Sequence, residues 1–408
     1  MRTLLQNSVF YPNMIGGAEQ STLLLARTLS ALGHQVDVLC TTGRRGRQNP
    51  RTRSVDGIDG RIFEGSSDGL LDLYPREEGA AGLLRKGLHH FKSVHSGRWE
   101  RWLRGHLAAN SYDLLHSNNL AGMGDAPWRA AAAAGLPVLH TLRDYALLCP
   151  RTTLWRSRGE ECERAPIPCR VLRGQKMAGS DAVSFWVAAS GFVLQRHDEL
   201  GSLGAAPQEV IPNAYPGEFP ESFQLPQSEP FRLLYMGQLE EHKGLRLCMR
   251  ALEFLWADGS EVECTIAGSG SLAHEVAAFV NASGGRCHYI GHVAGAEKQR
   301  ALLDASALVF PSLWREPFGL GVVEGFAYGR PVIACTGSGG PEELIREGSD
   351  GRLVAPTVEA LAAAVRDYLE SGDVLRAHAE AAWQRRDEFR AENMARRYLA
   401  AYERVAAI

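Results

Sequence analysis

The residues best suited to chemistry in this chain form the run EPFGLGVVE at 316–324. Its two carboxylates, Glu316 and Glu324, are eight residues apart and can accept hydrogen bonds from hydroxyl groups. A strand-like segment at 307–311 precedes the run, so its glycines should open a helix, where backbone amides and the helix dipole favour a bound anion. The amides concerned belong to Phe318, Gly319 and Leu320. The run therefore predicts a site for phosphate and for sugar or ribose hydroxyls.

Two shorter glycine turns lie at the ends of predicted strands. Gly16 and Gly17 separate a strand at 3–10 from a helix at 18–32, so their amides could face a diphosphate. The turn lacks GxGxxG spacing, and a purely structural turn is the alternative. The second turn, formed by Gly268, Ser269 and Gly270, would let a flat base or a ribose approach the backbone closely. A tight turn explains it equally well.

A lysine follows the first predicted strand of the second half. The segment MGQLEEHKG at 236–244 ends that strand and opens the next helix. Lys243 in this position is a suitable countercharge for a diphosphate leaving group. By itself, a lysine at such a turn is usually a surface residue.

Alternating strand and helix patterns must position these residues. The chain begins as strand, glycine turn, helix and a second strand at 35–40, which is a βαβ unit. Five prolines between 212 and 230 indicate a linker between two domains. Short apolar runs, typical of parallel strands buried on both faces, recur at 112–116, 137–141, 184–189, 209–212, 232–236, 263–267, 288–290, 307–311, 331–334 and 352–354.

These patterns predict an α/β fold of two Rossmann-like, doubly wound domains that face each other across a cleft. A chain of 408 residues is too long for one ordinary core. We expect domains at 1–220 and 221–385, with a helical segment at 386–408 that packs back towards the N-terminal domain. Because open α/β sheets bind ligands at the carboxyl ends of their strands, the cleft is the expected site.

Composition restricts the class of protein further. The chain is 45% hydrophobic and 22% charged, with a net charge of -3, which argues against bulk nucleic-acid binding. The amino end enters a strand at once, without the basic region and apolar stretch of a secretory signal. The longest apolar run, 183–194, is well short of the roughly 20 residues that cross a bilayer. We therefore expect a cytoplasmic protein.

Positive charge gathers in two segments, 44–53 and 83–107, and the second also carries Leu, Phe and Trp. One reading is a solvated loop and an ordinary surface helix. The other is that 83–107 docks on the anionic inner face of the plasma membrane as a peripheral contact. Docking would make a lipid-linked acceptor more plausible.

The eight cysteines do not form a disulfide framework in a chain of this length. Cys149, Cys162 and Cys169 lie in a loop rich in Arg and Pro, at spacings that do not resemble a CxxC pair. Three thiols could ligate zinc with a fourth ligand, but buried or free thiols are the favoured reading.

Together the motifs resemble the GT-B retaining glycosyltransferases of family four, also called group 1. The resemblance covers nearly the whole chain. It rests on GGAE at 16–19, DLLH at 113–116, RDYALLCPR at 143–151, VAAS at 187–190, IPNA at 211–214, MGQLEEHKG at 236–244, IAGSG at 266–270 and EPFGLGVVEGFAYGRPVIA at 316–334.

The resemblance implies a role for each matching position. The 1–220 domain would serve the acceptor side and 221–385 would bind a nucleotide sugar, with Gly17 touching its diphosphate and Lys243 balancing the phosphate charge. Glu316 would hold hydroxyls of the donor sugar, and Glu324 would bind the ribose. The loop residues Gly16, Gln238, Gly268, Ser269, Gly270, Phe318, Gly319 and Leu320 would complete the donor site, and Ser190, Asn213 and Asn118 would line the cleft.

Two positions depart from the family pattern. Gln238 stands where most relatives have an arginine, so one phosphate cation is missing unless Arg315 or an arginine from the other domain replaces it. Arg143 and Asp144 stand where many relatives read His-Asp. Arg143 cannot act as a base but could pair with the donor phosphate, so we count Arg143 and Asp144 with Lys243 and Glu316 as candidate catalytic residues.

The reaction implied by the resemblance is sugar transfer with retention of configuration to a glycan or lipid-linked acceptor, as in cell-surface polysaccharide or lipopolysaccharide biosynthesis. No carboxylate pair suits a hydrolase-type nucleophile, which favours a front-face displacement assisted by the leaving diphosphate. No DxD signature is placed to hold Mg²⁺, so we expect neither a metal nor a cofactor besides the nucleotide-sugar substrate. The alternatives are a nucleotide-sugar 2-epimerase and a binding protein that has lost catalysis.

Overall fold

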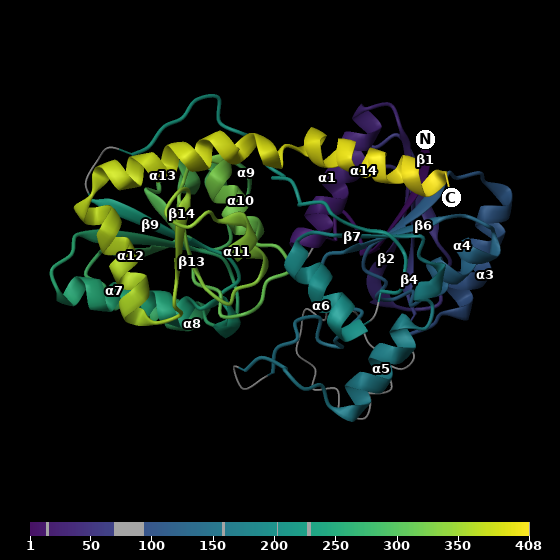
Figure 1. Ribbon diagram of the computed structural model, residues 1–408, viewed down its shortest axis with the longest axis horizontal. Helices are drawn as coiled ribbons and strands as arrows, with labels where there is room; N and C mark the ends of the chain where they lie inside the picture. The colour runs from purple at the N-terminus through teal and green to yellow at the C-terminus, as the bar shows by residue number, and fades with distance from the viewer. Residues whose placement is uncertain (14–15, 69–93, 157–159, 202, 227–229, 408) are drawn as a thin grey trace. The chain divides into compact units, whose positions relative to one another are not determined.

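The computed structural model describes residues 1–13, 16–68, 94–156, 160–201, 203–226 and 230–407 (Figure 1). The chain forms two compact units. Unit 1 comprises Met1–Leu154, Cys162–Pro216 and Ala391–Ile408, and unit 2 comprises Trp155–Glu161 and Gly217–Arg390. Each unit contains one sheet of mainly parallel strands with helices packed against it, which confirms the predicted pair of Rossmann-like α/β domains.

The sheet of unit 1 has the order β3-β4-β2-β1-β5-β6-β7-β8, and only the pair of β3 and β4 is antiparallel. Its central strand β1 lies between β2 and β5, so the winding direction changes there, and ligands bind at the carboxyl ends of strands beside such a point. The strands are β1 (Arg2–Val9), β2 (Gln35–Arg45), β3 (Arg51–Arg53), β4 (Ile62–Ser67), β5 (Leu114–Ser117), β6 (Val138–Leu142), β7 (Phe185–Ala188) and β8 (Gln208–Val210).

Helices cover this sheet and bury its central strands. β5, β6 and β7 are buried along their whole length, which explains their continuous apolar pattern. The helices of unit 1 are α1 (Gly17–Ala31), α3 (Gly97–Ala109), α4 (Ala126–Ala133), α5 (Ile167–Met177), α6 (Gly191–Gly201) and α14 (Ala391–Ala406).

The last helix of the chain, α14, belongs to unit 1 and lies against α1 (Figure 1). One face of α14 enters the core of unit 1. Two tyrosines on that face reach the sheet: Tyr402 shares a hydrogen bond of 2.6 Å with His116, and Tyr398 one of 3.2 Å with Thr141. The final residues of the sequence thus complete the domain that its first residues begin.

The sheet of unit 2 is parallel throughout, with the order β11-β10-β9-β12-β13-β14. β9 lies between β10 and β12, so the winding direction again changes at the first strand of the unit. The strands are β9 (Phe231–Met236), β10 (Val262–Ala267), β11 (Cys287–Tyr289), β12 (Ala307–Phe310), β13 (Val332–Cys335) and β14 (Gly351–Val354). The helices are α7 (Leu245–Ala257), α8 (Ala273–Ala282), α9 (Gly295–Asp304), α10 (Leu320–Ala327), α11 (Gly340–Leu344), α12 (Val358–Glu370) and α13 (Gly372–Arg385).

The basic segment at 44–53 is not simply a solvated loop, because its two ends belong to strands. β2 continues to Arg45, and Arg51–Arg53 forms β3. β3 and β4 were not predicted, since Arg-Thr-Arg and Ile-Phe-Glu-Gly-Ser-Ser lack an apolar pattern. An antiparallel edge strand such as β3 can be polar because it is not covered on both faces.

The second basic segment, 83–107, is described only from residue 94. There α3 turns Trp99 and Leu103 into the interior, and Trp102 stacks on His106, so these apolar residues pack within the unit. Peripheral membrane contact through 83–107 stays a prediction, with residues 83–93 outside the described part. Among the described residues, no helix is long and apolar enough to cross a membrane.

Candidate functional site

The predicted run at 316–324 comprises the end of the loop between β12 and α10 and the first residues of α10, at the carboxyl edge of the unit 2 sheet. Gly319 precedes α10 with a φ of 102°, and a Cβ there would lie 2.8 Å from Cγ of Pro341. The loop is fastened to its neighbour by two backbone hydrogen bonds: Glu316 N–H donates to the Ser338 carbonyl at 2.7 Å, and Gly340 N–H donates to the Glu316 carbonyl at 2.9 Å. Gly319 is therefore required by close loop packing.

Glu316 forms an ion pair with Lys243, 2.6 Å from Nζ to Oε1. The Ser312 hydroxyl donates to the same carboxylate oxygen at 3.0 Å, and the lysine ammonium lies 4.5 Å from the ring centre of Trp314. The carboxylate is only 6% exposed. Two of the predicted catalytic residues, 73 positions apart, thus meet at the ends of neighbouring strands.

Glu324, also 6% exposed, forms an ion pair with Lys298 of α9. Burial raises the pKa of the Glu324 carboxyl, while the lysine charge and hydrogen bond oppose that rise. Lys298 was not predicted. One signal could have found it: residues 221–408 contain two lysines, Lys243 and Lys298, and each is paired with one of the two glutamates.

The glycines at 268 and 270 sit where the loops after β9 and β10 touch. A Cβ on Gly268 would lie 1.8 Å from the Gly237 carbonyl oxygen, and one on Gly270 would lie 2.5 Å from that of Leu239. The neighbouring Ser269 and Gln238 side chains are exposed. The turn therefore has a structural reason for its glycines, and its donor-binding role stays a prediction.

Arg315, a possible replacement for the missing phosphate arginine, forms an ion pair with Glu161 at 2.9 Å. In unit 1, Gly17 begins α1 and is exposed, while the Gly16 N–H donates to Glu19 at 2.9 Å. A diphosphate role for this turn also stays a prediction.

Arg143 is 8% exposed and lies in a hydrogen-bond network of unit 1. Its guanidinium donates to Oδ1 of Asn118 and to Oγ of Ser21, each at 2.8 Å, to Oδ1 of Asn213, and to the Tyr398 hydroxyl at 3.2 Å. The network unites three predicted residues. It also shows Arg143 joining the ends of separate strands to α14. The fourth predicted residue here, Ser190, accepts a hydrogen bond from Val193 N–H at the start of α6.

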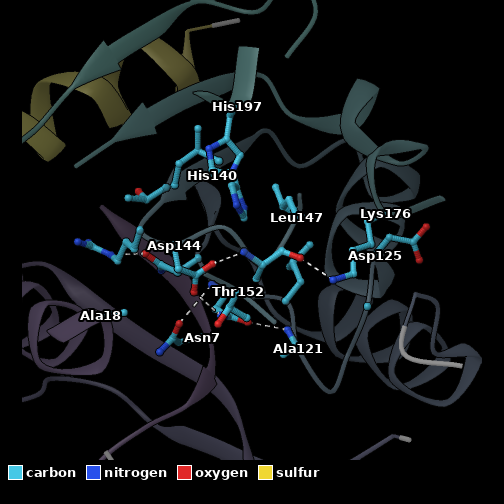
Figure 2. Close-up of a pocket in the computed structure, with 18 of the residues that line it drawn as sticks. Asn7, Ala18, Ala121, Asp125, His140, Asp144, Leu147, Thr152, Lys176 and His197 are labelled. Atoms are coloured by element: carbon cyan, nitrogen blue, oxygen red, sulfur yellow. Dashed lines mark hydrogen bonds between the residues drawn. The ribbon is translucent and has the colours of Figure 1, made fainter. Parts of the chain in front are cut away.

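Beside this network, at the carboxyl ends of β5 and β6, unit 1 contains a pocket of about 1000 Å³, counting the open space at its mouth (Figure 2). Asp144 lies in its wall, accepting hydrogen bonds from Asn119 Nδ2 at 2.5 Å and from Ala146 N–H at 2.6 Å. Burial raises the pKa of this carboxyl. Lys176 of α5 lies in the same wall and donates to the Ala146 carbonyl at 2.5 Å.

The thiols of Cys149, Cys162 and Cys169 are free and half-buried. Burial, and secondarily the two neighbouring thiols, raise the pKa of Cys169. The described residues contain no group of three His, Cys, Asp or Glu side chains arranged to hold a metal ion.

Comparison with known proteins identifies the class that this fold and these sites define. Residues 219–385 match the family model "Glycosyl transferases group 1", and residues 16–214 match "Glycosyl transferase 4-like domain". The chain belongs to the group 1 glycosyltransferases, has the GT-B fold, and is a transferase enzyme, which confirms the resemblance seen in the sequence.

Several relatives span most of the chain. A glycogen synthase of Mycobacterium tuberculosis is 27% identical, covering 94% of this chain and 90% of its own. A phosphatidyl-myo-inositol mannosyltransferase of Mycolicibacterium smegmatis is 26% identical, covering 89% and 83%. An uncharacterized protein in the cps region of Klebsiella pneumoniae is 25% identical, covering 85% and 88%.

Solved structures share the fold at lower identity. The sucrose-phosphate synthase of Thermosynechococcus elongatus superimposes with a TM-score of 0.73 at 19% identity, covering 100% of both chains. Anabaena HepE in complex with UDP gives a TM-score of 0.67 at 16% identity, covering 99% of this chain and 100% of the other.

Proposed function

We propose that the enzyme transfers a sugar, with retention of configuration, from a nucleoside-diphosphate sugar bound by unit 2 to a glycan or lipid-linked acceptor. The observation that carries the proposal is the pair of lysine–glutamate contacts at the carboxyl edge of the unit 2 sheet. One buried carboxylate lies before helix α10 and one within it, and each is paired with an ammonium group, which matches a ligand that combines hydroxyls with a diphosphate.

In this proposal, Lys243 moves from Glu316 to the diphosphate when the donor binds. Glu316 is then free to accept hydrogen bonds from the donor sugar, while Glu324 accepts them from the ribose. An ammonium on a flexible stem suits this exchange because it is a compact charge with three donors. Charge that develops on the leaving diphosphate would be stabilised by Lys243 and by the amides before α10.

Two relatives support a role in cell-surface polysaccharide or glycolipid assembly. One lies in a cps region and another is named as a phosphatidyl-myo-inositol mannosyltransferase, while HepE binds UDP in a fold of the same type. We therefore propose a glycan or glycolipid product, made by a protein that acts in the cytoplasm or at the inner face of the plasma membrane.

Nucleotide binding tests the donor site directly. We expect UDP, GDP or ADP to raise the melting temperature of the wild-type protein, because a ligand that binds only the folded state stabilises it. Lys243→Met should weaken binding of that nucleotide about tenfold or more, as expected for a lost charge-assisted hydrogen bond. Arg246→Met on the neighbouring helix α7, where the side chain is exposed, is the matched control and should bind normally. Equal calorimetric affinities for Lys243→Met and wild type would refute the assignment.

Metal dependence tests the leaving-group assignment separately. Because the sequence has no DxD signature and Lys243 is assigned to the diphosphate, transfer should continue at its full rate in excess EDTA. The measurement is product formation from nucleotide sugar with EDTA and with added Mg²⁺. Loss of activity in EDTA that Mg²⁺ restores would contradict a purely protein-based stabilisation.

A further inference from the structure

The pocket of unit 1 contains charged groups that the donor site does not use. Asp144 and Lys176 are hydrogen-bonded to the backbone of the same residue: Ala146 N–H donates to the carboxylate, and the Ala146 carbonyl accepts from the ammonium. Among the ion pairs of the described residues, none joins Asp144 to Lys176 directly. Ala146 therefore lies between a negative and a positive group, both in the wall of one cavity (Figure 2).

Lys176 has unused hydrogen-bonding capacity. An ammonium has three N–H donors, and the contact with the Ala146 carbonyl is the single hydrogen bond that the structure gives this one. Burial lowers the pKa of Lys176, although Asp144 opposes that effect. Lys176 is half-buried, and its two remaining N–H donors are open to a partner from the pocket.

Two histidines in the same wall are uncharged at neutral pH. Burial lowers the pKa of His140 to about 3 and that of His197 to about 4. Nδ1 of His197 contacts the Val193 carbonyl at 2.8 Å and must carry the proton, so Nε2 is a bare acceptor, and this buried atom has no partner in the structure. The wall therefore holds an unsatisfied acceptor as well as an unsatisfied donor.

This balance of groups selects the kind of ligand. An anion such as phosphate would satisfy Lys176 but would face the carboxylate of Asp144. A hydroxyl both donates and accepts, so a ring with several hydroxyls can satisfy the ammonium and the carboxylate together. The remaining wall includes Leu120, Leu142, Leu147 and Pro150, which can pack on the C–H face of a sugar.

We infer that this pocket binds an uncharged sugar ring, the terminal residue of the acceptor, with Asp144 and Lys176 holding its hydroxyls. The inference rests on the proposed function, and it narrows the acceptor to one whose receiving group is a glycosyl residue rather than a phosphate headgroup. A lipid carrier, where there is one, would then be attached beyond the sugar that enters the pocket.

The test uses the full-length protein without donor. Methyl α-glucoside, α-mannoside and α-galactoside are compared with inorganic phosphate by saturation-transfer NMR and calorimetry. We expect at least one glycoside to bind and phosphate not to compete with it. Asp144→Asn and Lys176→Met should each weaken glycoside binding about tenfold, the effect of one lost hydrogen bond to a charged group. Arg170→Met, an exposed position on the same helix α5, is the control and should bind as wild type.

Three results would overturn the inference: no glycoside binds the wild type, phosphate competes with the glycoside, or both variants bind it normally. Melting temperatures of the variants, and their affinity for UDP, GDP or ADP, show that unit 2 and the fold are intact. A wild-type protein that binds glycosides but no nucleotide would refute the proposed donor function alone. One that binds nucleotide but no glycoside would refute the pocket assignment alone.

Discussion

Lysine is used sparingly in this protein, and its positions are informative. The chain has 44 basic residues, of which five are lysines, and the three in the described structure are Lys176, Lys243 and Lys298. Each lies at a candidate site, whereas arginines make most of the other ion pairs. A lysine is a compact charge on a flexible stem that can exchange one partner for another, while the planar guanidinium of arginine suits fixed contacts.

Arg143 is a charged residue whose side chain is held in place by several hydrogen bonds. Its guanidinium reaches residues of α1, of the loops after β5 and β8, and of α14. Because these four contacts engage it within unit 1, we assign it a positioning role beside the pocket and not a role as a base.

The contact of Lys298 with Glu324 predicts a dependence of nucleotide binding on pH. Glu324 accepts hydrogen bonds from a ribose most strongly when it is ionised, and its pKa is raised by burial but held down by Lys298. In Lys298→Met that restraint is lost, so the pKa rises further and binding should fail at a higher pH as the solution is acidified. The measurement is the dissociation constant of the nucleotide across the acid range.

At alkaline pH, where Glu324 is ionised in both proteins, the two affinities should converge. Arg246→Met controls for the loss of a positive charge elsewhere in unit 2 and should follow the wild-type curve. If the dissociation constant of Lys298→Met differs from that of the wild type by the same factor at every pH, the lysine contacts the nucleotide and does not act by lowering the pKa of Glu324.

At the scale of elements, helix α10 is positioned by glycine packing. Gly319→Ala introduces a Cβ at a φ of 102° and 2.8 Å from Pro341, so strain and overlap act together. Gly337→Ala is the matched control, because its φ is also positive, at 81°, but its Cβ would meet open space. We expect the control to lose about 1 kcal/mol of folding stability from backbone strain alone, and Gly319→Ala to lose more.

Urea unfolding and nucleotide affinity measure the two consequences. Gly319→Ala should also weaken binding of the nucleotide, because the backbone amides before α10 must shift to make room for the added Cβ. Equal losses of stability in the two variants, with unchanged nucleotide affinity, would mean that the loop adjusts without disturbing the helix.

At the scale of the whole molecule, the C-terminal helix α14 is needed for unit 1, which contains the N-terminal residues, to stay folded. Helix α14 contributes Met394, Tyr398, Tyr402 and Val405 to the core of unit 1. Each fully buried large side chain contributes about 1.5–3 kcal/mol. Their sum is comparable with the roughly 5–15 kcal/mol by which a protein is stable at all. The chain that ends at Arg390 should therefore fail to keep unit 1 folded.

Limited proteolysis distinguishes the two units in that truncated chain. We expect rapid cleavage within unit 1, with a resistant fragment that begins near Gly217. Tyr402→Phe, which keeps the apolar contacts and removes only the hydrogen bond to His116, is the milder control and should leave unit 1 resistant. Equal resistance of both units in the truncated chain would refute the dependence on α14.

The sequence by itself determined the α/β class, because the strands of a parallel sheet buried on both faces appear as short apolar runs. Every such run used for the prediction overlaps an observed strand, while the polar strands β3 and β4 carried no such signal. The loop at 316–324 and Lys243 were also visible as motifs, since their residue types and local spacing are enough to predict phosphate and hydroxyl chemistry.

Only the tertiary structure decided which of these residues meet. The pairing of Glu316 with Lys243 depends on β12 lying beside β9, which brings distant strand ends together, and the pairing of Glu324 with Lys298 joins helices α10 and α9. The pocket of Asp144 and Lys176 likewise needs the path of α5 past the end of β6. The periodicity of apolar residues indicates which face of a helix or strand is buried. Contacts between loops depend instead on the order of the strands and on the path that each loop takes. For that reason the lysine partners, and the balanced charges of the pocket, were seen only in the folded chain.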